Sequence, residues 1–359
     1  MRKVLNIADV KPNYKVGGLN SMVNQLVDAL ESLHYDSQLL YFRGTASKSS
    51  QTQYKGLIEL FKLLRKNKFD VVIIHSIYHP LYPFIAMLVK ISGATLFIQS
   101  HGSLTENAFN KPSLKKLIYK PLISAMLKIS DKFIFSNESE FSHSIIKGSD
   151  KVKYIPNLIN FVPQDVDYSP NGNKLVFLGK VDFYYKGIDR MLEGLAELKA
   201  RGLHAELDIY GYGENKDLSF EEMVEQDPSI IQLLARIDEL NLSKSVFFKG
   251  LLDPVNRRSL ASHYDALVLF SSSEAMPLVI SESLAEGLPV LISKETNMGS
   301  YVDKFNCGLV LKENVAATIE RFMLASNSAK QAMSQNAKNC FANCLDIKYL
   351  ENIVKELEI

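Results

Sequence analysis

Short, continuous runs of apolar residues recur along this chain and alternate with longer amphipathic segments. A strand that is apolar at nearly every position is buried on both faces, as it is when helices cover both sides of a parallel sheet. Runs of this kind predict strands at Lys3–Ala8, Ser37–Phe42, Asp70–His75, Leu96–Ser100, Lys132–Phe135, Lys174–Leu178, Ala205–Tyr210, Val246–Phe248, Ala266–Phe270 and Val290–Ile292. With helices predicted between them, the chain is expected to be an α/β protein with parallel sheets.

The length of the chain, 359 residues, suits roughly two domains. The stretch from Pro163 to Asn173 is rich in residues that favour turns, so the boundary is expected there. We therefore predict two Rossmann-like domains, residues 1–165 and 170–344. They should face each other across a cleft at the carboxyl ends of their strands.

The charge is distributed unevenly between the two halves. Residues 1–160 contain 21 Lys and Arg against 11 Asp and Glu, whereas the rest of the chain contains 20 against 29. The basic half suits an anionic surface, and the acidic half needs local basic residues wherever it binds phosphate. Nothing in the pattern points to nucleic acid, and no nucleic-acid partner is expected.

The chain has no apolar run near the ~20 residues that a membrane span needs. Its N-terminus enters a predicted strand directly, without the apolar core of a signal peptide. The three cysteines are an odd number without the spacing of a metal site, which suits a reducing compartment. We therefore expect a cytoplasmic protein.

A pair of glutamates marks the best candidate for a binding site. Glu274 follows the predicted strand Ala266–Phe270, and Glu282 lies eight residues further on, inside a predicted helix that begins near Pro277. The start of a helix attracts phosphate through its free N–H groups and its partial positive charge. Ionised carboxylates accept hydrogen bonds from hydroxyls. Hydroxyls and a diphosphate together describe a nucleotide-sugar.

Two lysines and two glycines fit the same ligand. Lys180 and Lys186 flank a loop after the strand Lys174–Leu178, where ammonium groups can offset the charge of a diphosphate. Gly17 and Gly18, after the first strand, permit the close approach of a ligand to the backbone. The dinucleotide fingerprint Gly-x-Gly-x-x-Gly is absent from this first loop, which weakens the alternative of an NAD enzyme.

Three histidines follow strands of the first half. His101 comes directly after Leu96–Ser100 and before a glycine, which favours a functional position. His75 and His79 close the preceding strand, and with Tyr78 they could line a pocket for an acceptor. For His75 the alternative of a satisfied core histidine stays equally open.

These motifs occur in the order found in a known family. Glu274 and Glu282 with Gly287-Leu-Pro-Val290, Lys186-Gly187 and His101-Gly102 resemble glycosyltransferase family 4, the retaining group 1 glycosyltransferases with the GT-B fold. The resemblance runs from the first strand to at least Val310. It implies that the N-terminal domain holds the acceptor and the C-terminal domain a nucleotide-sugar.

The resemblance also assigns roles to residues. Catalytic roles are implied for His101, Glu274 and Lys186. Donor binding is implied for Gly17, Gly18, Lys180, Lys186, Gly211, Leu252, Glu274, Ala275, Met276, Pro277, Leu278, Val279 and Glu282. Glu282 would bind the ribose hydroxyls and Glu274 the sugar hydroxyls. The chain departs from the family where Lys180 replaces an arginine and Ala275-Met276-Pro277 varies the central triplet. As in the family, a C-terminal helix within 345–359 should pack back on the first domain.

The function implied is transfer of a sugar from a nucleotide-sugar to a glycan or lipid-linked acceptor, with retention of anomeric configuration. Neither a metal nor another cofactor is expected. Two alternatives stay open, a nucleotide-sugar epimerase of the same fold and a non-catalytic subunit. The basic amphipathic segments Tyr54–Lys68 and Lys111–Lys132 fit either core packing or docking on an anionic membrane surface, which would make the protein peripheral on the inner face of the membrane.

Overall fold

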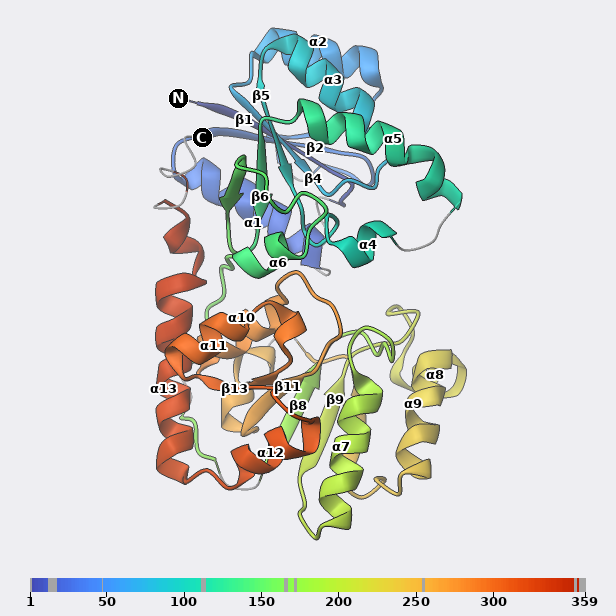
Figure 1. Cartoon of the computed structure of the whole chain (residues 1–359), viewed down its shortest axis with the longest axis vertical. Coiled ribbons are helices and arrows are strands. Elements are labelled where there is room, and N and C mark those ends of the chain that lie inside the picture. Colours follow the sequence, from blue (N-terminus) through green and yellow to red (C-terminus); the bar gives the residue numbers. More distant parts are fainter. Residues whose placement is uncertain are drawn as a thin grey trace. The chain divides into compact units, whose positions relative to one another are not determined.

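The computed structural model describes residues 2–11, 18–46, 48–110, 114–164, 167–170, 173–253, 256–351 and 354. The chain divides into two compact units (Figure 1). The N-terminal unit comprises Met1–Asn160 and Ile347–Ile359, and the C-terminal unit comprises Phe161–Asp346.

The N-terminal unit is built on a seven-stranded parallel sheet with the order β3-β2-β1-β4-β5-β6-β7. Its strands are β1 (Lys3–Ala8), β2 (Asp36–Tyr41), β3 (Gln51–Gln53), β4 (Val71–His75), β5 (Thr95–Gln99), β6 (Lys132–Phe135) and β7 (Val152–Tyr154). The helices between them are α1 (Gly18–Ser32), α2 (Leu57–Asn67), α3 (Tyr82–Ser92), α4 (Glu106–Asn110), α5 (Leu114–Ile129) and α6 (Glu138–Ser142).

Both faces of this sheet are buried. Successive side chains of a strand point to opposite faces, so Val4 joins the core cluster with Leu26 and Leu30 of α1, whereas Leu5 joins the cluster under α2, α3 and α5. Figure 1 shows these last three helices together over one side of the sheet. This two-sided burial is why the strands read as continuous apolar runs.

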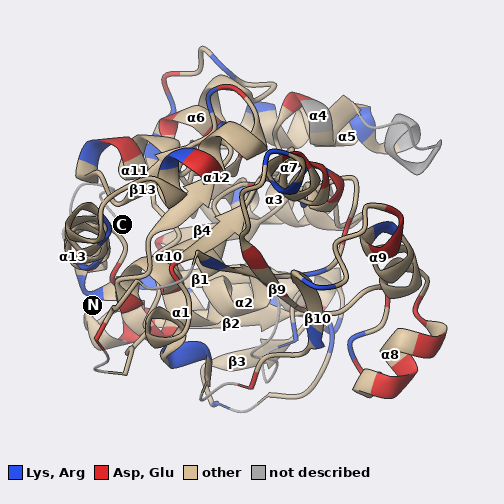
Figure 2. Ribbon diagram, turned by 90° about the horizontal axis from the view of Figure 1, so that it is seen from below, with Lys and Arg blue, Asp and Glu red and all other residues tan. Residues whose placement is uncertain are grey.

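The C-terminal unit repeats the plan with six parallel strands in the order β10-β9-β8-β11-β12-β13. Its strands are β8 (Lys174–Leu178), β9 (Glu206–Tyr210), β10 (Val246–Gly250), β11 (Ala266–Leu269), β12 (Val290–Ile292) and β13 (Gly308–Val310). Its α-helices are α7 (Ile188–Ala200), α8 (Phe220–Gln226), α9 (Pro228–Glu239), α10 (Leu278–Glu286), α11 (Gly299–Phe305), α12 (Val315–Met323) and α13 (Asn327–Cys344). Figure 2 shows Asp and Glu gathered on α8 and α9 of this acidic unit.

The prediction of two parallel α/β domains is confirmed. Each predicted strand is present, with ends that differ by at most two residues. Three strands were not predicted, namely β3, β7 and β13, each of which is only three residues long. Among the described residues, none of the helices is both long and apolar enough to span a membrane.

The C-terminal segment packs within the N-terminal unit. It begins with a 3₁₀ turn, Ile347–Tyr349, and continues with α-helical residues at 350, 351 and 354, while residues 352, 353 and 355–359 of the predicted segment lie outside the described residues. Leu350 and Val354 are buried in the same cluster as Val4 and Leu26. The first strand and the end of the chain therefore share one core.

Truncating Leu350 should destabilise the N-terminal unit. Leu350→Ala removes a side chain that is 1% exposed and leaves a cavity, which costs about 2–5 kcal/mol. We expect faster amide hydrogen exchange in β1 and β4, measured in the intact protein. Leu324→Ala is the matched control, because Leu324 is 73% exposed and its loss should change stability by less than about 0.5 kcal/mol. Equal protection of β1 in both variants would contradict this packing.

Candidate functional site

The order of the strands places a ligand site in each unit. Both sheets reverse their winding direction between the first and fourth strands of the unit, at β1/β4 and at β8/β11. Ligands of open parallel sheets bind outside the carboxyl ends of the strands at such a point. The loops after β5, β8 and β11 carry His101, Lys186 and Glu274, and His75 is the last residue of β4. Gly17 lies outside the described residues, and Gly18 is the first residue of α1.

Glu274 is held in place by side chains from three loops, which follow β8, β11 and β12. Its Oε1 forms an ion pair with the Nζ of Lys186 and accepts a hydrogen bond from the Oγ of Ser271 at 3.1 Å. The Nδ2 of Asn297 donates to the backbone carbonyl of Glu274 at 2.6 Å. No described residue donates a hydrogen bond to Oε2.

Glu282 shows the same arrangement on α10. The guanidinium of Arg257 donates to its Oε2 through Nε, at 2.8 Å, and through Nη2. The described residues provide no partner for Oε1. Burial raises the pKa of Glu282 above its ordinary value, and Arg257 opposes this shift. Each glutamate is therefore anchored by a cation through one oxygen and keeps the other as a hydrogen-bond acceptor.

Gly187 brings Lys186 to Glu274. It has a φ of 69° and lies so close to β11 that a Cβ atom would come within 2.1 Å of the carbonyl oxygen of Phe270. Only glycine fits this approach. Lys180 lies at the other end of the loop and pairs with Glu214 at 3.2 Å in a more exposed position. Both lysines thus border the carboxyl end of the sheet, but only Lys186 contacts the glutamate pair.

The segment after Glu274 leads into α10. Pro277 is the N-cap residue, and Met276 and Pro277 are buried, whereas Ala275 is half-buried. Leu278 and Val279 form the first turn, where an α-helix has no internal acceptor for its N–H groups. The helix start thus directs N–H groups toward the same end of the sheet as Glu274.

Gly211 and Leu252 follow the neighbouring strands. Gly211 donates its N–H to Gly250 at 2.7 Å, and a Cβ atom on it would come within 1.8 Å of the carbonyl oxygen of Gly179. The loop after β9 therefore lies against the loop after β8. Leu252 is half-buried in the loop after β10.

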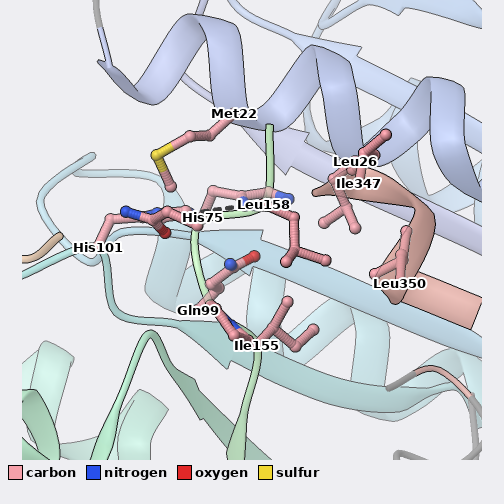
Figure 3. Close-up of a pocket in the computed structure, with 11 residues that line it drawn as sticks. Met22, Leu26, His75, Gln99, His101, Ile155, Leu158, Ile347 and Leu350 are labelled. Atoms are coloured by element: carbon pink, nitrogen blue, oxygen red, sulfur yellow. Dashed lines mark hydrogen bonds between the residues drawn. The ribbon is translucent and has the colours of Figure 1, made fainter. Parts of the chain in front are cut away.

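In the N-terminal unit, a chain of hydrogen bonds links His101 to the core. The Nε2 of His101 lies 3.0 Å from the Nδ1 of His75, and the Nε2 of His75 lies 3.0 Å from the Oδ1 of Asn6. Figure 3 shows the two rings beside a small pocket of about 20 Å³ that is lined mainly by apolar side chains. His101 has a φ of 48°, a conformation that costs a non-glycine residue energy and often marks a functional position.

The three residues predicted to line an acceptor pocket have different surroundings. His75 is completely buried and, with His101, lines the small pocket, so its contact with an acceptor stays a prediction. Tyr78 is exposed as a residue, but its hydroxyl group points to the carbonyl of Ser103 and donates a hydrogen bond to it at 2.9 Å. Partial burial of the phenol raises its pKa to about 12. His79 is half-buried, and its ring centroid lies 4.0 Å from that of Phe42 at a tilt of 38°.

Sequence reasoning missed four residues that hold the site. Arg257 anchors Glu282, Asn297 fixes the backbone of Glu274, Asn6 holds His75, and Glu140 accepts the N–H of Gly102 at 2.6 Å. Asn6 could have been noticed in the sequence, because it is a polar residue inside an otherwise apolar strand. Arg257 could also have been noticed, because it belongs to a pair of adjacent arginines in an acidic domain. The other two partners become visible only when distant loops are folded together.

The described residues contain no group of three or more His, Cys, Asp and Glu side chains arranged to hold a metal ion. The charges available near Glu274 and Glu282 are those of lysine and arginine.

Comparison with known proteins shows the family to which the chain belongs. The family model described as glycosyl transferases group 1 matches residues 163–340. The chain belongs to the group 1 glycosyltransferases. Its similarity to the lipopolysaccharide glucosyltransferase WaaG of Escherichia coli K12 is 28% identity over 198 residues, which is 54% of this chain and 48% of WaaG. The match thus spans about half the length of that relative.

A longer match relates the chain to an Escherichia coli enzyme named UDP-Gal:alpha-D-GlcNAc-diphosphoundecaprenol alpha-1,3-galactosyltransferase, with 25% identity over 85% of this chain and 79% of that protein. Among solved structures, Anabaena HepE in complex with UDP and glucose superposes with a TM-score of 0.72, 16% identity and full coverage of both chains. The likeness shows that this group 1 glycosyltransferase has the GT-B fold.

A further carboxyl group, that of Glu286, lies on α10 one helical turn after Glu282. It is 1% exposed, its Oε2 accepts the N–H of Ala261 at 3.3 Å, and its Oε1 has no hydrogen-bond partner among the described residues. Burial raises the pKa of Glu286 to about 8, the backbone N–H groups of Ala261 and Leu260 oppose the shift, and the charge of Glu282 adds to it.

This carboxyl should make the stability of the glycosyltransferase depend on pH. Its folded pKa is above the unfolded value of 4.5, so its contribution is complete below pH 4.5 and is lost as pH rises through about 8. The side chain in Glu286→Gln cannot ionise. The free energy of unfolding of this variant should therefore exceed that of the parent protein by an amount that grows from pH 5 to pH 9 and reaches about 1–3 kcal/mol. Urea unfolding at several pH values measures this, with the exposed Glu221→Gln as control. A constant difference across this range would contradict a buried neutral acid.

Proposed function

We propose that this protein transfers a hexose from a nucleotide-sugar to a glycan or lipid-linked acceptor, with retention of anomeric configuration. The observation that carries the proposal is the pair of carboxylates at the carboxyl end of the second sheet. Glu274 and Glu282 are each fixed by a cation through one oxygen and offer the other to a hydroxyl. A pentose and a hexose joined by a diphosphate supply hydroxyls at both ends of such a site.

The diphosphate would lie between the two carboxylates. The N–H groups at the start of α10, at Leu278 and Val279, suit an anion, as do the ammonium groups of Lys186 and Lys180. As the bond between the sugar and the diphosphate breaks, negative charge grows on the leaving oxygen, and these groups stabilise it. Transfer then needs no metal, and the acceptor hydroxyl attacks from the face that the diphosphate leaves.

The N-terminal unit would hold the acceptor, with His101 facing the transferred sugar. Two of the relatives named above support a glycan or lipid-linked acceptor, since one is named for lipopolysaccharide and the other for a diphosphoundecaprenol-linked sugar. The HepE structure with UDP and glucose supports a UDP-sugar as donor. A cytoplasmic location follows from the need for nucleotide-sugars.

Glu282→Gln should weaken binding of UDP, because a charged acceptor for the ribose hydroxyls is lost. Hydrogen bonds to charged groups contribute about 1.5–3 kcal/mol, so the Kd should rise roughly ten- to a hundredfold. Titration calorimetry of the intact protein with UDP measures this. Glu313→Gln, an exposed glutamate on the same unit, should leave the Kd unchanged. An unchanged Kd in Glu282→Gln would refute the assignment of the ribose site.

The same preparation tests the reaction class. UDP-glucose, UDP-galactose and UDP-N-acetylglucosamine are each incubated with the protein, and free UDP is measured. A transferase releases UDP quickly only when an acceptor takes the sugar, an epimerase converts the UDP-sugar to its epimer without net release of UDP, and a non-catalytic subunit does neither. Nuclear magnetic resonance of the product then reports whether the anomeric configuration is retained. Loss of transfer with EDTA would contradict a mechanism without metal.

We further propose that the N-terminal unit docks on an anionic membrane surface through the α2–α3–α5 face. Helix α3 lies between α2 and α5. The exposed apolar side chains of these helices are Ile58, Phe84, Met87, Ile91, Leu122 and Ile129. Exposed cations of α2 border them at Lys62, Arg65, Lys66 and Lys68, and Lys62 also pairs with Glu59. Apolar groups beside cations suit the boundary between headgroups and acyl chains.

Vesicle binding should depend on both lipid charge and salt. Each Lys or Arg near an anionic surface contributes about 1 kcal/mol, screened over about 8–10 Å at physiological salt. We expect co-sedimentation with phosphatidylglycerol vesicles at low salt and much less with phosphatidylcholine vesicles. Binding should fall in a variant with four cations of α2 changed to Gln, namely Lys62, Arg65, Lys66 and Lys68.

A control with the same change in charge separates docking from net charge. Four exposed lysines of the C-terminal unit are changed to Gln in it, namely Lys244, Lys294, Lys304 and Lys312. This variant should sediment like the parent protein. If both variants lose binding equally, or the parent stays in the supernatant throughout, the α2–α3–α5 face is not a membrane contact.

A further inference from the structure

The hydrogen-bond chain from Asn6 to His101 has a fixed direction. The Nδ2 of Asn6 lies 3.5 Å from the backbone carbonyl of Gln38, which can only accept, and 3.3 Å from the Oγ of Ser37. The amide nitrogen of Asn6 therefore faces β2, and its Oδ1 faces His75 at 3.0 Å. Since Oδ1 can only accept, the Nε2 of His75 carries the hydrogen.

The hydrogen position on His75 in turn fixes the one on His101. Burial, with a further contribution from His101, holds the pKa of His75 well below its ordinary value, so the buried ring is neutral and its Nδ1 has a lone pair. The Nε2 of His101 lies 3.0 Å from this lone pair and must donate to it. Burial lowers the pKa of His101 to about 3, so this ring is also neutral at physiological pH. Its remaining nitrogen, Nδ1, is then an acceptor.

The backbone around His101 is fixed as well. The carboxylate of Glu140 on α6 accepts the N–H of Gly102 at 2.6 Å and both the N–H and the hydroxyl of Ser136. Glu140 is the charged residue in most direct contact with the loop, and both of its carboxylate oxygens already accept hydrogen bonds from Gly102 and Ser136. The ring is thus held from β1 and β4, and the loop from α6.

We propose that Asn6 and His75 are positioning residues that lock His101 in the Nε2–H tautomer. His101 then presents only a lone pair to the ligand, and no described residue is hydrogen-bonded to that nitrogen. The proposal deepens the proposed function and rests on it for the identity of the ligand. It requires that the sugar group at His101 carry a hydrogen, as a hydroxyl or amide does. An anionic oxygen there would face a lone pair and be rejected.

Nitrogen-15 spectra of the histidine rings test the tautomer without any substrate. The intact protein is labelled on its seven histidines, and the signals of His75 and His101 are assigned from their loss in His75→Gln and His101→Gln. We expect both rings to be Nε2–H and neutral from pH 6 to pH 8. An Nδ1–H tautomer at His101, or its protonation in this range, would overturn the proposal whatever the protein catalyses.

Variants of Asn6 test the consequence for turnover. Asn6→Leu removes the acceptor and should shift His101 toward a mixture of tautomers, with kcat/KM for the UDP-sugar lowered about five- to tenfold. Asn6→Asp keeps an acceptor and should retain the tautomer.

If Asn6→Leu fails to fold, the spectra of the parent and of Asn6→Asp still decide the tautomer. Normal tautomers in a protein without transferase activity would refute the proposed function and leave the lock intact. Unchanged turnover with a mixed tautomer would refute the role of the lock in catalysis.

Discussion

The parallel direction of all strands is the constraint on which the rest of this protein depends. Because the strands of each unit run the same way, their carboxyl ends meet at one edge, and every loop that follows them is brought to that edge. Loops separated by almost ninety residues, such as those of Lys186 and Glu274, thereby come into contact. A site made of such loops needs little further structure, provided that glycines such as Gly187 allow the close approach.

The site is organised by pairing charges in advance of any ligand. Glu274 and Glu282 are each held by one cation, which orients the carboxylate while its second oxygen can still accept a hydrogen bond. The N-terminal unit uses neutral groups instead, since loss of solvent lowers the pKa of both His75 and His101 and a charge on either ring would be costly. The two units thus differ in chemistry, with paired charges in the C-terminal unit and neutral imidazole rings in the N-terminal unit.

Particular elements show how far the sequence could lead. Continuous apolar runs predicted strands such as Lys174–Leu178 and Lys132–Phe135 with correct ends, because two-sided burial leaves a strong pattern. The three-residue strand β3 has no such pattern, since its pairing comes from the edge of β2. The candidate residues Glu274, Glu282 and Lys186 were found as motifs, but the motif does not contain Arg257, whose place beside Glu282 depends on a turn 25 residues away.

By itself the sequence determined the fold class, the positions of most strands and the kinds of group at their carboxyl ends, because these depend on local periodicity and on residue type. Only the tertiary structure decided which of these groups touch. It buried His75 between Asn6 and His101, with a ring nitrogen 3.0 Å from a polar atom of each. Such relations depend on distances between residues far apart in the chain, and the direction of a hydrogen bond depends on the geometry of every partner along it.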